Sequence, residues 1–169
     1  MTLTELFRGK KITWKQEKFF RQEYTLYADN EKVAVMRYPK FFSTAVEVEM
    51  LGHVFDLYQP KLFRGLVEMK DRASGQVIVT MPKEKLLKDS EILVAGKTFL
   101  FHRTFMGQRF SILSDTGAVL FEIIKRSFFR TEADIKADPV FAGKEEFPVL
   151  VVFAWYQILR IQHRQAAAA

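Results

Sequence analysis

Much of this chain alternates between apolar and polar side chains in short stretches, with the two-residue period of half-buried β-strands. In the clearest stretch, Val46, Val48 and Met50 alternate with Glu47 and Glu49. Asp, Asn, Ser and Gly residues, which favour turns, separate many of these stretches. Strands are predicted at residues 11–15, 24–27, 32–36, 46–50, 53–58, 66–70, 76–81, 92–95, 98–101, 109–113, 118–123 and 127–135. The pattern predicts a series of hairpins. One short helical turn is predicted before them, at residues 3–7, and residues 82–88 fit either a helical turn or an irregular strand.

One segment near the end of the chain has a different pattern. Between Pro148 and Leu159 the only strongly polar side chain is Gln157. A helix that is apolar all round has no face for solvent, so protein or lipid must enclose it. About thirteen helical residues span roughly 20 Å, whereas the bilayer core is about 30 Å thick. We therefore predict a buried central helix over about residues 147–161, with membrane anchoring as the alternative.

A closed sheet around this helix satisfies both patterns. It covers the apolar face of every hairpin and every side of the helix, and it leaves no strand edge exposed. Large rigid side chains suit the space between helix and wall, and the chain has seventeen Phe residues, among them Phe42, Phe55, Phe99, Phe101, Phe110 and Phe121. We predict a mainly β fold: a closed barrel of about twelve strands around a buried hydrophobic C-terminal helix. The barrel forms one domain over residues 1–165, and residues 166–169 are expected to be a frayed tail.

Two segments resemble the tubby C-terminal-like superfamily, which groups tubby proteins, phospholipid scramblases and LURP-one-related proteins. The segment 146–155, Glu-Phe-Pro-Val-Leu-Val-Val-Phe-Ala-Trp, is similar to the aromatic-Pro start of the family's final hydrophobic helix. The segment 113–123 is similar to the strand, Asp/Asn-Gly turn and return strand of scramblases and LURP-one proteins. The resemblance covers roughly residues 10–162.

The resemblance implies a barrel of about twelve strands threaded by a C-terminal helix. It also implies phosphoinositide binding, as in tubby proteins, or a lipid or calcium role, as in scramblases. Phe153, Trp155 and Tyr156 are larger than the residues common in tubby helices, so the packing must differ. No phosphoinositide-contacting motif matches residue by residue, and the resemblance therefore assigns no site.

The chain has 26 Lys and Arg against 20 Asp and Glu, a formal net charge of +6. Basic surfaces attract anionic partners such as phospholipid headgroups or nucleic acid, although they also serve simply as solvated surfaces that prevent aggregation. Three groups combine basic and aromatic residues or concentrate lysines. They are Arg8, Lys10, Lys11, Lys15 and Lys18 near Trp14; Lys83, Lys85 and Lys88; and Lys125, Arg126 and Arg130 beside Phe128 and Phe129.

Signs of catalytic or cofactor chemistry are missing from the sequence. There are no cysteines, which excludes disulfides and Cys-ligated metals. The three histidines lack metal-ligand spacing, and the P-loop, dinucleotide and Gly-x-Ser-x-Gly motifs do not occur. A single Asp115-Thr-Gly resembles half of an aspartic protease site, but such a site needs two carboxylates. We predict no cofactor, no metal and no enzymatic activity. The first residues also lack a signal-peptide core, which indicates a cytoplasmic protein.

The leading hypothesis is a binding module for anionic phospholipid or phosphoinositide headgroups, peripheral to the membrane. In it Lys10, Lys11, Lys15 and Lys18 neutralise phosphates, while Trp14 lies at the membrane interface. A protein-interaction scaffold is the main alternative. A small-molecule carrier is disfavoured because the helix fills the barrel, and a nucleic-acid binder or an enzyme of unrecognised type are further alternatives.

Overall fold

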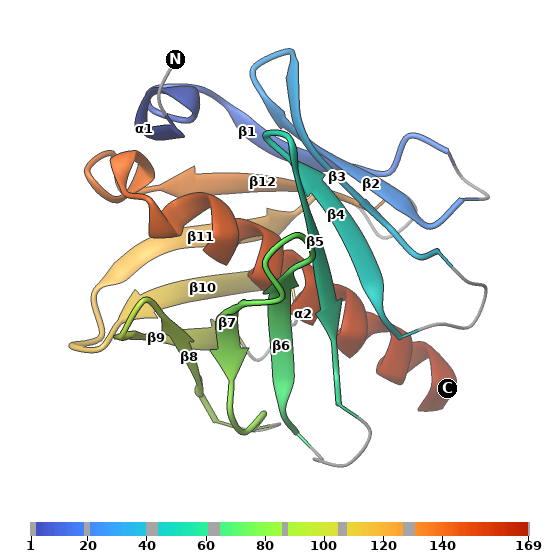
Figure 1. Cartoon of the computed structure of the whole chain (residues 1–169). Coiled ribbons are helices and arrows are strands. Elements are labelled where there is room, and N and C mark those ends of the chain that lie inside the picture. Colours follow the sequence, from blue (N-terminus) through green and yellow to red (C-terminus); the bar gives the residue numbers. More distant parts are fainter. Residues whose placement is uncertain are drawn as a thin grey trace.

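The computed structural model of the protein describes residues 3–18, 21–39, 44–60, 65–85, 88–104, 108–126 and 131–168. Within these ranges twelve antiparallel strands form a closed barrel, in which each strand pairs with its neighbours in the sequence and β1 pairs with β12 (Figure 1). The strands are β1 (Ile12–Lys15), β2 (Glu23–Ala28), β3 (Glu31–Arg37), β4 (Val46–Met50), β5 (His53–Tyr58), β6 (Val67–Asp71), β7 (Val77–Met81), β8 (Ser90–Val94), β9 (Lys97–Arg103), β10 (Arg109–Ser114), β11 (Val119–Lys125) and β12 (Glu132–Ala137). The predicted closed barrel of about twelve strands is confirmed.

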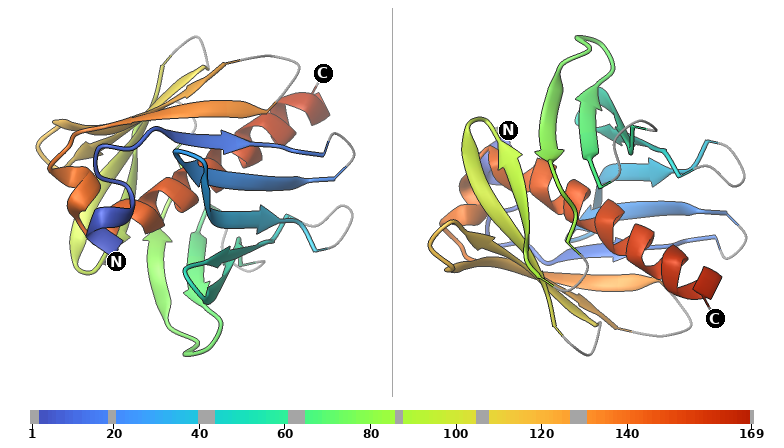
Figure 2. Two further views of the ribbon diagram at one scale, coloured as in Figure 1. Left: turned by 90° about the horizontal axis from the view of Figure 1, so that it is seen from above. Right: turned by 90° about the horizontal axis from the view of Figure 1, so that it is seen from below.

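The barrel encloses the C-terminal helix α2 (Glu146–Ala168), which runs along its interior (Figure 2). Two short helices, α1 (Leu3–Leu6) and η1 (Phe141–Gly143), lie near the start of α2. From Phe147 to Leu159 every residue of α2 except Val149 is buried. Pro148 occupies the first turn, where its missing N–H costs no hydrogen bond. The buried part of α2 agrees with the predicted central helix at 147–161.

The chain end differs from the prediction of a frayed tail at residues 166–169. Its described part, residues 166–168, continues α2 as an exposed helix outside the barrel. Alanine has the highest intrinsic helix propensity, so an existing helix extends readily through these residues.

Aromatic rings fill the space between α2 and the barrel wall. Trp14 of β1 stacks on Trp155 of α2, with ring centroids 5.5 Å apart, and Tyr24 of β2 meets Trp155 edge-on at 5.9 Å. Near the start of α2, Phe7 and Phe121 both meet Phe147 edge-on at 5.4 Å. Of the phenylalanines predicted for the core, five are buried, namely Phe55, Phe99, Phe101, Phe110 and Phe121. Phe42 lies outside the described residues.

The antiparallel meander gives the barrel two distinct ends. We call the end where α2 begins the proximal end and the end where α2 leaves the barrel the distal end (Figure 2). The segments that join β1 to β2, β3 to β4, β5 to β6, β7 to β8, β9 to β10 and β11 to β12 connect strand ends at the distal end. The remaining hairpin turns, and the connection from β12 to α2, belong to the proximal end. This division determines which charges of the sequence lie together.

Removing the side chain of Trp14 should destabilise the barrel strongly, because Trp14 is 0% exposed and stacks on α2. We expect Trp14→Ala to lower the free energy of unfolding by about 3–5 kcal/mol. Trp14→Phe retains a stacking ring and should lose less. The exposed neighbour Lys11 provides the control, since Lys11→Ala should stay within about 0.5 kcal/mol of the parent. Urea unfolding followed by circular dichroism measures all three, and a Trp14→Ala protein as stable as Lys11→Ala would contradict the assigned packing.

Candidate functional site

The basic residues of the connecting segments are concentrated at the distal end. By sequence, the six distal segments, residues 16–22, 38–45, 59–66, 82–89, 104–108 and 126–131, contain ten Lys or Arg and three Asp or Glu. The ten are Lys18, Arg21, Lys40, Lys61, Arg64, Lys83, Lys85, Lys88, Arg126 and Arg130, and the three are Glu17, Glu84 and Asp89. The proximal segments 29–30, 51–52, 72–76, 95–96, 115–118 and 138–145 contain two basic residues, Arg72 and Lys144, and four acidic ones, Asp29, Asp115, Asp138 and Glu145. The connecting segments of the two ends therefore differ in charge, although Arg8, Lys10 and Lys11, which precede β1, fall outside this count.

The structure separates the four lysines predicted to bind headgroups. Lys10 and Lys11 precede β1 at the proximal end, where the Nζ atom of Lys10 lies 3.8 Å from a carboxylate oxygen of Glu31. Lys15 ends β1 on the distal side, with its Nζ atom 5.6 Å from the centroid of the Tyr27 ring. Lys18 follows it and is exposed. The predicted group is thus divided between opposite ends of the barrel.

The prediction that Trp14 meets a membrane is wrong. Its side chain is 0% exposed because β1 directs it into the barrel against Trp155. The alternation in Lys11-Ile-Thr-Trp-Lys15 places Ile12 and Trp14 on the same face of the strand. That face is the inner one, so the basic residues beside Trp14 in the sequence point away from it.

A buried ionic network holds the distal part of α2. Glu84, between β7 and β8, has a side chain only 6% exposed and receives hydrogen bonds from Gln157 (2.7 Å), Arg160 (3.1 Å) and Arg164. Arg160 is 10% exposed and also donates to the side-chain oxygen of Gln59 at 3.0 Å. Burial by itself would raise the pKa of the Glu84 carboxyl, but Arg164, Arg160 and Gln157 together hold that pKa below its ordinary value. The network fixes segment 82–85 against the helix.

Basic side chains surround this network at the surface. Lys85, Lys88 and Arg103 line a shallow depression together with Arg164 and Glu84. Lys85, Lys88 and Arg103 are exposed, and no carboxylate of the described ranges forms an ion pair with any of them. Two of the three belong to the predicted group of Lys83, Lys85 and Lys88. The depression therefore offers several uncompensated positive charges to an anion.

The positive charge of the third predicted basic group is more fully compensated. The guanidinium of Arg126 donates from both Nε and Nη2 to the carboxylate of Asp134 on β12. Lys125 is half-buried, and this burial lowers the pKa of its ammonium. Arg130, Phe128 and Phe129 lie outside the described residues. Arg126 and Lys125 thus contribute less free charge than the group around Lys88.

A further sequence pattern, not among the predicted site residues, coincides with the distal end. Each of the six distal segments contains two adjacent large apolar residues: 19–20, 41–42, 62–63, 86–87, 105–106 and 128–129. A Lys or Arg stands within two positions of every pair. None of the five proximal hairpin turns contains such a pair, whereas the sixth proximal segment, 138–145, contains Val140 and Phe141. The pairs themselves lie outside the described residues, so the pattern is one of sequence and chain topology. Its recurrence once per hairpin was the signal available from the sequence.

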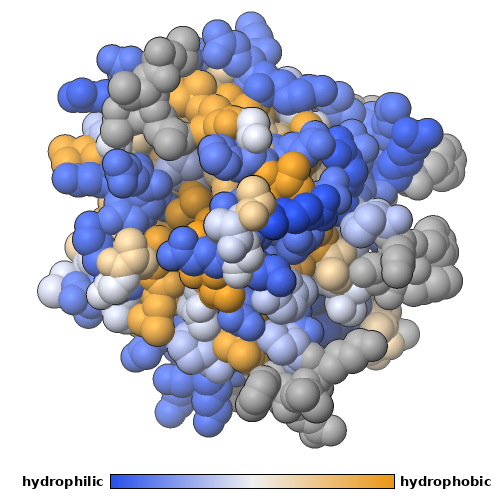
Figure 3. Space-filling view, viewed as in Figure 1, coloured by the Kyte–Doolittle hydropathy of each residue, from blue (hydrophilic) through white to orange (hydrophobic). Residues whose placement is uncertain are grey.

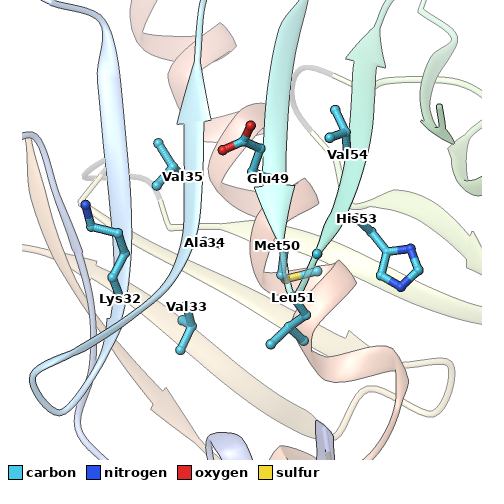
Figure 4. A pocket seen from close by; sticks show the side chains of 10 residues that line it. Lys32, Val33, Ala34, Val35, Glu49, Met50, Leu51, His53 and Val54 are labelled. Atoms are coloured by element: carbon cyan, nitrogen blue, oxygen red, sulfur yellow. The ribbon is translucent and has the colours of Figure 1, made fainter. Parts of the chain in front are cut away.

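A shallow groove also crosses the outer wall of the barrel over β3, β4 and β5, with a volume of about 320 Å³. Val35, Glu49 and Val54 are cross-strand neighbours and lie side by side along it (Figure 4). Its lining includes three ionisable side chains, Lys32, Glu49 and His53, which lie apart from one another (Figure 4), so they form no cluster that suggests a chemistry.

Among the described residues, no helix combines the length and the apolar character needed to cross a membrane. In the same ranges, no three His, Asp or Glu side chains are grouped so that they could hold a metal ion.

Comparison with known proteins yields a structural similarity. No protein-family model matches the sequence, and no curated protein matches it. A protein from Arabidopsis thaliana, known from its X-ray structure, superposes with a TM-score of 0.61 at 7% sequence identity. The similarity covers 93% of this chain and 96% of the Arabidopsis chain. At this identity the likeness shows that the two proteins share a fold, a closed barrel with one C-terminal helix.

The lowered pKa of Glu84 predicts a pH-dependent stability. The carboxylate is ionised in the folded protein at a pH where the unfolded chain, with a pKa of about 4.3, already takes up a proton. Its contribution is therefore complete well above pH 4.3 and is lost as the pH falls through the folded pKa. Glu84→Gln should lower the free energy of unfolding at pH 7 by about 3 kcal/mol, and its loss of stability on acidification should be smaller than that of the parent.

Urea unfolding at several pH values between 7 and 3 measures both effects. Glu91→Gln, at an exposed position on β8, is the matched control and should follow the parent. Parallel curves for the parent and Glu84→Gln would contradict the ionic role of Glu84.

Proposed function

We propose that this protein is a non-enzymatic module that binds the anionic surface of a membrane peripherally, through the distal end of its barrel. One observation carries the proposal. The end that gathers basic side chains is also the end at which every connecting segment contains, by sequence, a pair of large apolar residues. Basic residues combined with large apolar ones are the composition of surfaces that lie in the headgroup region of a bilayer.

The two kinds of residue supply different parts of the binding energy. A Lys or Arg near an anionic bilayer contributes about 1 kcal/mol, and this attraction decays within a Debye length of about 8 Å at physiological salt. Lys85, Lys88 and Arg103 suit this role because they are exposed and have no carboxylate partner in the described ranges. Apolar side chains that enter the interface contribute a term that salt does not screen. Together they favour attachment at physiological ionic strength.

The proposed site keeps part of the sequence-based prediction and replaces the rest. Lys15 and Lys18 remain candidates because they lie on the distal side of β1. Lys10 and Lys11 belong to the proximal end and are not included. Lys83, Lys85 and Lys88 are the second predicted group, and the fold adds Arg103 and Arg164 to it.

We further propose that the chain belongs to the tubby C-terminal-like superfamily and acts in the cytoplasm. A closed barrel of twelve strands around a C-terminal helix supports the family assignment, as does the Phe147-Pro148 start of that helix. Anionic lipids are concentrated in the cytoplasmic leaflet, which suits a basic binding surface.

Charge reversal at the distal end should abolish binding to anionic vesicles. The test variant combines Lys85→Glu, Lys88→Glu and Arg103→Glu. The control combines Lys11→Glu, Lys32→Glu and Lys144→Glu, three exposed proximal lysines without an ion pair to any described residue, and it changes the net charge equally. We expect the distal variant to bind at least about 100-fold more weakly than the parent, and the control to bind nearly as well.

Flotation with phosphatidylcholine vesicles, with and without phosphatidylserine or a phosphoinositide, measures this difference. Equal losses of vesicle binding in the two variants would mean that binding depends only on the net charge of the protein. That result would overturn the distal site. Failure of the parent to float with any anionic vesicle would overturn the proposed function. Oligonucleotide binding without vesicle binding would favour the nucleic-acid alternative.

The apolar pairs predict that binding resists salt. The double variant Phe128→Ser with Phe129→Ser keeps every charge but loses an apolar contribution that salt does not screen, so it should bind at least about tenfold more weakly than the parent at low and at physiological salt. Because salt also weakens the electrostatic attraction, the variant should lose measurable binding at physiological salt while the parent keeps it. Val119→Ser with Val140→Ser is the control, because these two valines are exposed at the proximal end (52% and 72%). Flotation at two salt concentrations checks the prediction, and a Phe variant that binds as tightly as the parent at physiological salt would contradict it.

A further inference from the structure

A cavity of about 690 Å³ lies at the proximal end, beside the first turn of α2. Its apolar lining comes from four separate parts of the chain, namely α1, the β4–β5 hairpin, β7 and α2. The side chains are Leu6, Met50, Leu51, Phe55, Ile78, Pro148 and Val149. On the face shown in Figure 3, hydrophobic residues gather in the upper and central parts, where α1 and the β4–β5 and β6–β7 hairpins lie in Figure 1. The volume is within the range of about 300–1,000 Å³ that is typical of small-molecule sites.

The cavity exists because the barrel wall diverges from α2 at this point. The β6–β7 hairpin extends away from the helix (Figure 2), and β7 pairs with β8 through only two residue pairs, Val79 with Val94 and Thr80 with Leu93. A bulge in the β6–β7 ladder leaves Ile78 without a cross-strand partner on β6, and Ile78 lines the cavity. Such bulges commonly redirect a side chain near a binding site. Val149, beside the cavity, is also the one incompletely buried residue between Phe147 and Leu159.

The turn at the rim of the cavity has an unfavourable residue. Leu51 adopts the left-handed conformation (φ 54°) ahead of Gly52 (φ 79°), and its side chain is 43% exposed. Asn, Asp or Gly is the usual residue at this position of a two-residue hairpin turn. A bulky apolar residue there costs free energy without gaining burial. Contact between Leu51 and a bound molecule would account for it.

Carboxylates predominate among the ionisable groups of the cavity. Asp71 and Glu145 line it together with His53, and no Lys or Arg of the described residues does. Glu145 is exposed and has no ion-pair partner among the described residues. Asp71 accepts hydrogen bonds from the Ser74 hydroxyl (2.8 Å) and the Ala73 amide (3.3 Å), and these hold the pKa of its carboxyl below the ordinary value. Both carboxylates therefore favour a positively charged group.

We infer that this cavity binds a small amphipathic organic cation. The apolar body of the ligand lies against Leu51, Ile78 and Val149, and its ammonium group lies near Asp71 and Glu145. This site is at the opposite end of the barrel from the proposed membrane surface, so the two can be occupied together and tested separately.

Three probes of matched shape, octylammonium, octanol and octanoate, test which head-group charge the cavity prefers. Binding is followed by methyl NMR of Leu6, Leu51, Ile78 and Val149 and by calorimetry. We expect octylammonium to shift these methyl signals and to bind about fivefold more tightly than octanol, with octanoate binding weakest. Equal affinity for the three probes would overturn the assigned charge preference, and unchanged methyl signals with octylammonium would overturn the site.

Variants separate the two parts of the interaction. Glu145→Gln should weaken octylammonium by about two- to fivefold and leave octanol unchanged. Leu51→Asn suits the left-handed turn but removes an apolar contact, so it should weaken both ligands. Ala95→Asn is its matched control, because Ala95 (φ 50°) precedes Gly96 (φ 75°) in the same kind of turn, away from the cavity. Equal effects of Leu51→Asn and Ala95→Asn on binding would contradict the inference.

Discussion

The removal of α2 from water is the interaction on which the fold depends. From Phe147 to Leu159 the helix offers no polar face, so it is stable only inside an apolar enclosure. The barrel supplies that enclosure and in turn needs the helix, because the inner faces of its strands would otherwise surround empty space. The stack of Trp14 on Trp155 illustrates how closely wall and helix depend on each other. Neither unit buries its apolar surface alone.

The architecture was readable from the sequence because it follows from periodicity. Alternation in segments such as Val46–Met50 identifies strands, and the unbroken apolar run after Pro148 identifies the helix. The candidate site was less readable, because neighbouring residues of a strand face opposite sides. Trp14 and Lys15 are adjacent in the sequence, yet one enters the core and the other faces solvent. Lys10 and Lys18 likewise appear as one basic group, although β1 carries them to opposite ends.

Residues distant in the sequence come together only after the topology is known. Lys88 belongs to the β7–β8 connection, Arg103 ends β9 and Arg164 belongs to α2, yet all three line one depression with Glu84. Alternation of strand direction also sorts the connecting segments into two sets, one predominantly basic and one slightly acidic. The same sorting leaves the apolar cavity and its carboxylates at the end opposite the basic surface. The two ends of the barrel, at opposite ends of α2, therefore differ in both charge and shape.

The position of α2 after all twelve strands has a consequence for the order in which the chain folds. During synthesis every strand emerges before the segment that fills the barrel, and β1 must wait for β12 to pair with it. Contacts such as Trp14 with Trp155 join residues far apart in the sequence, and structures dominated by such contacts fold slowly. Until α2 arrives, the apolar inner faces of the strands remain accessible to solvent and to other chains. The nascent protein thus has a period of vulnerability to aggregation that ends only when its last helix is enclosed.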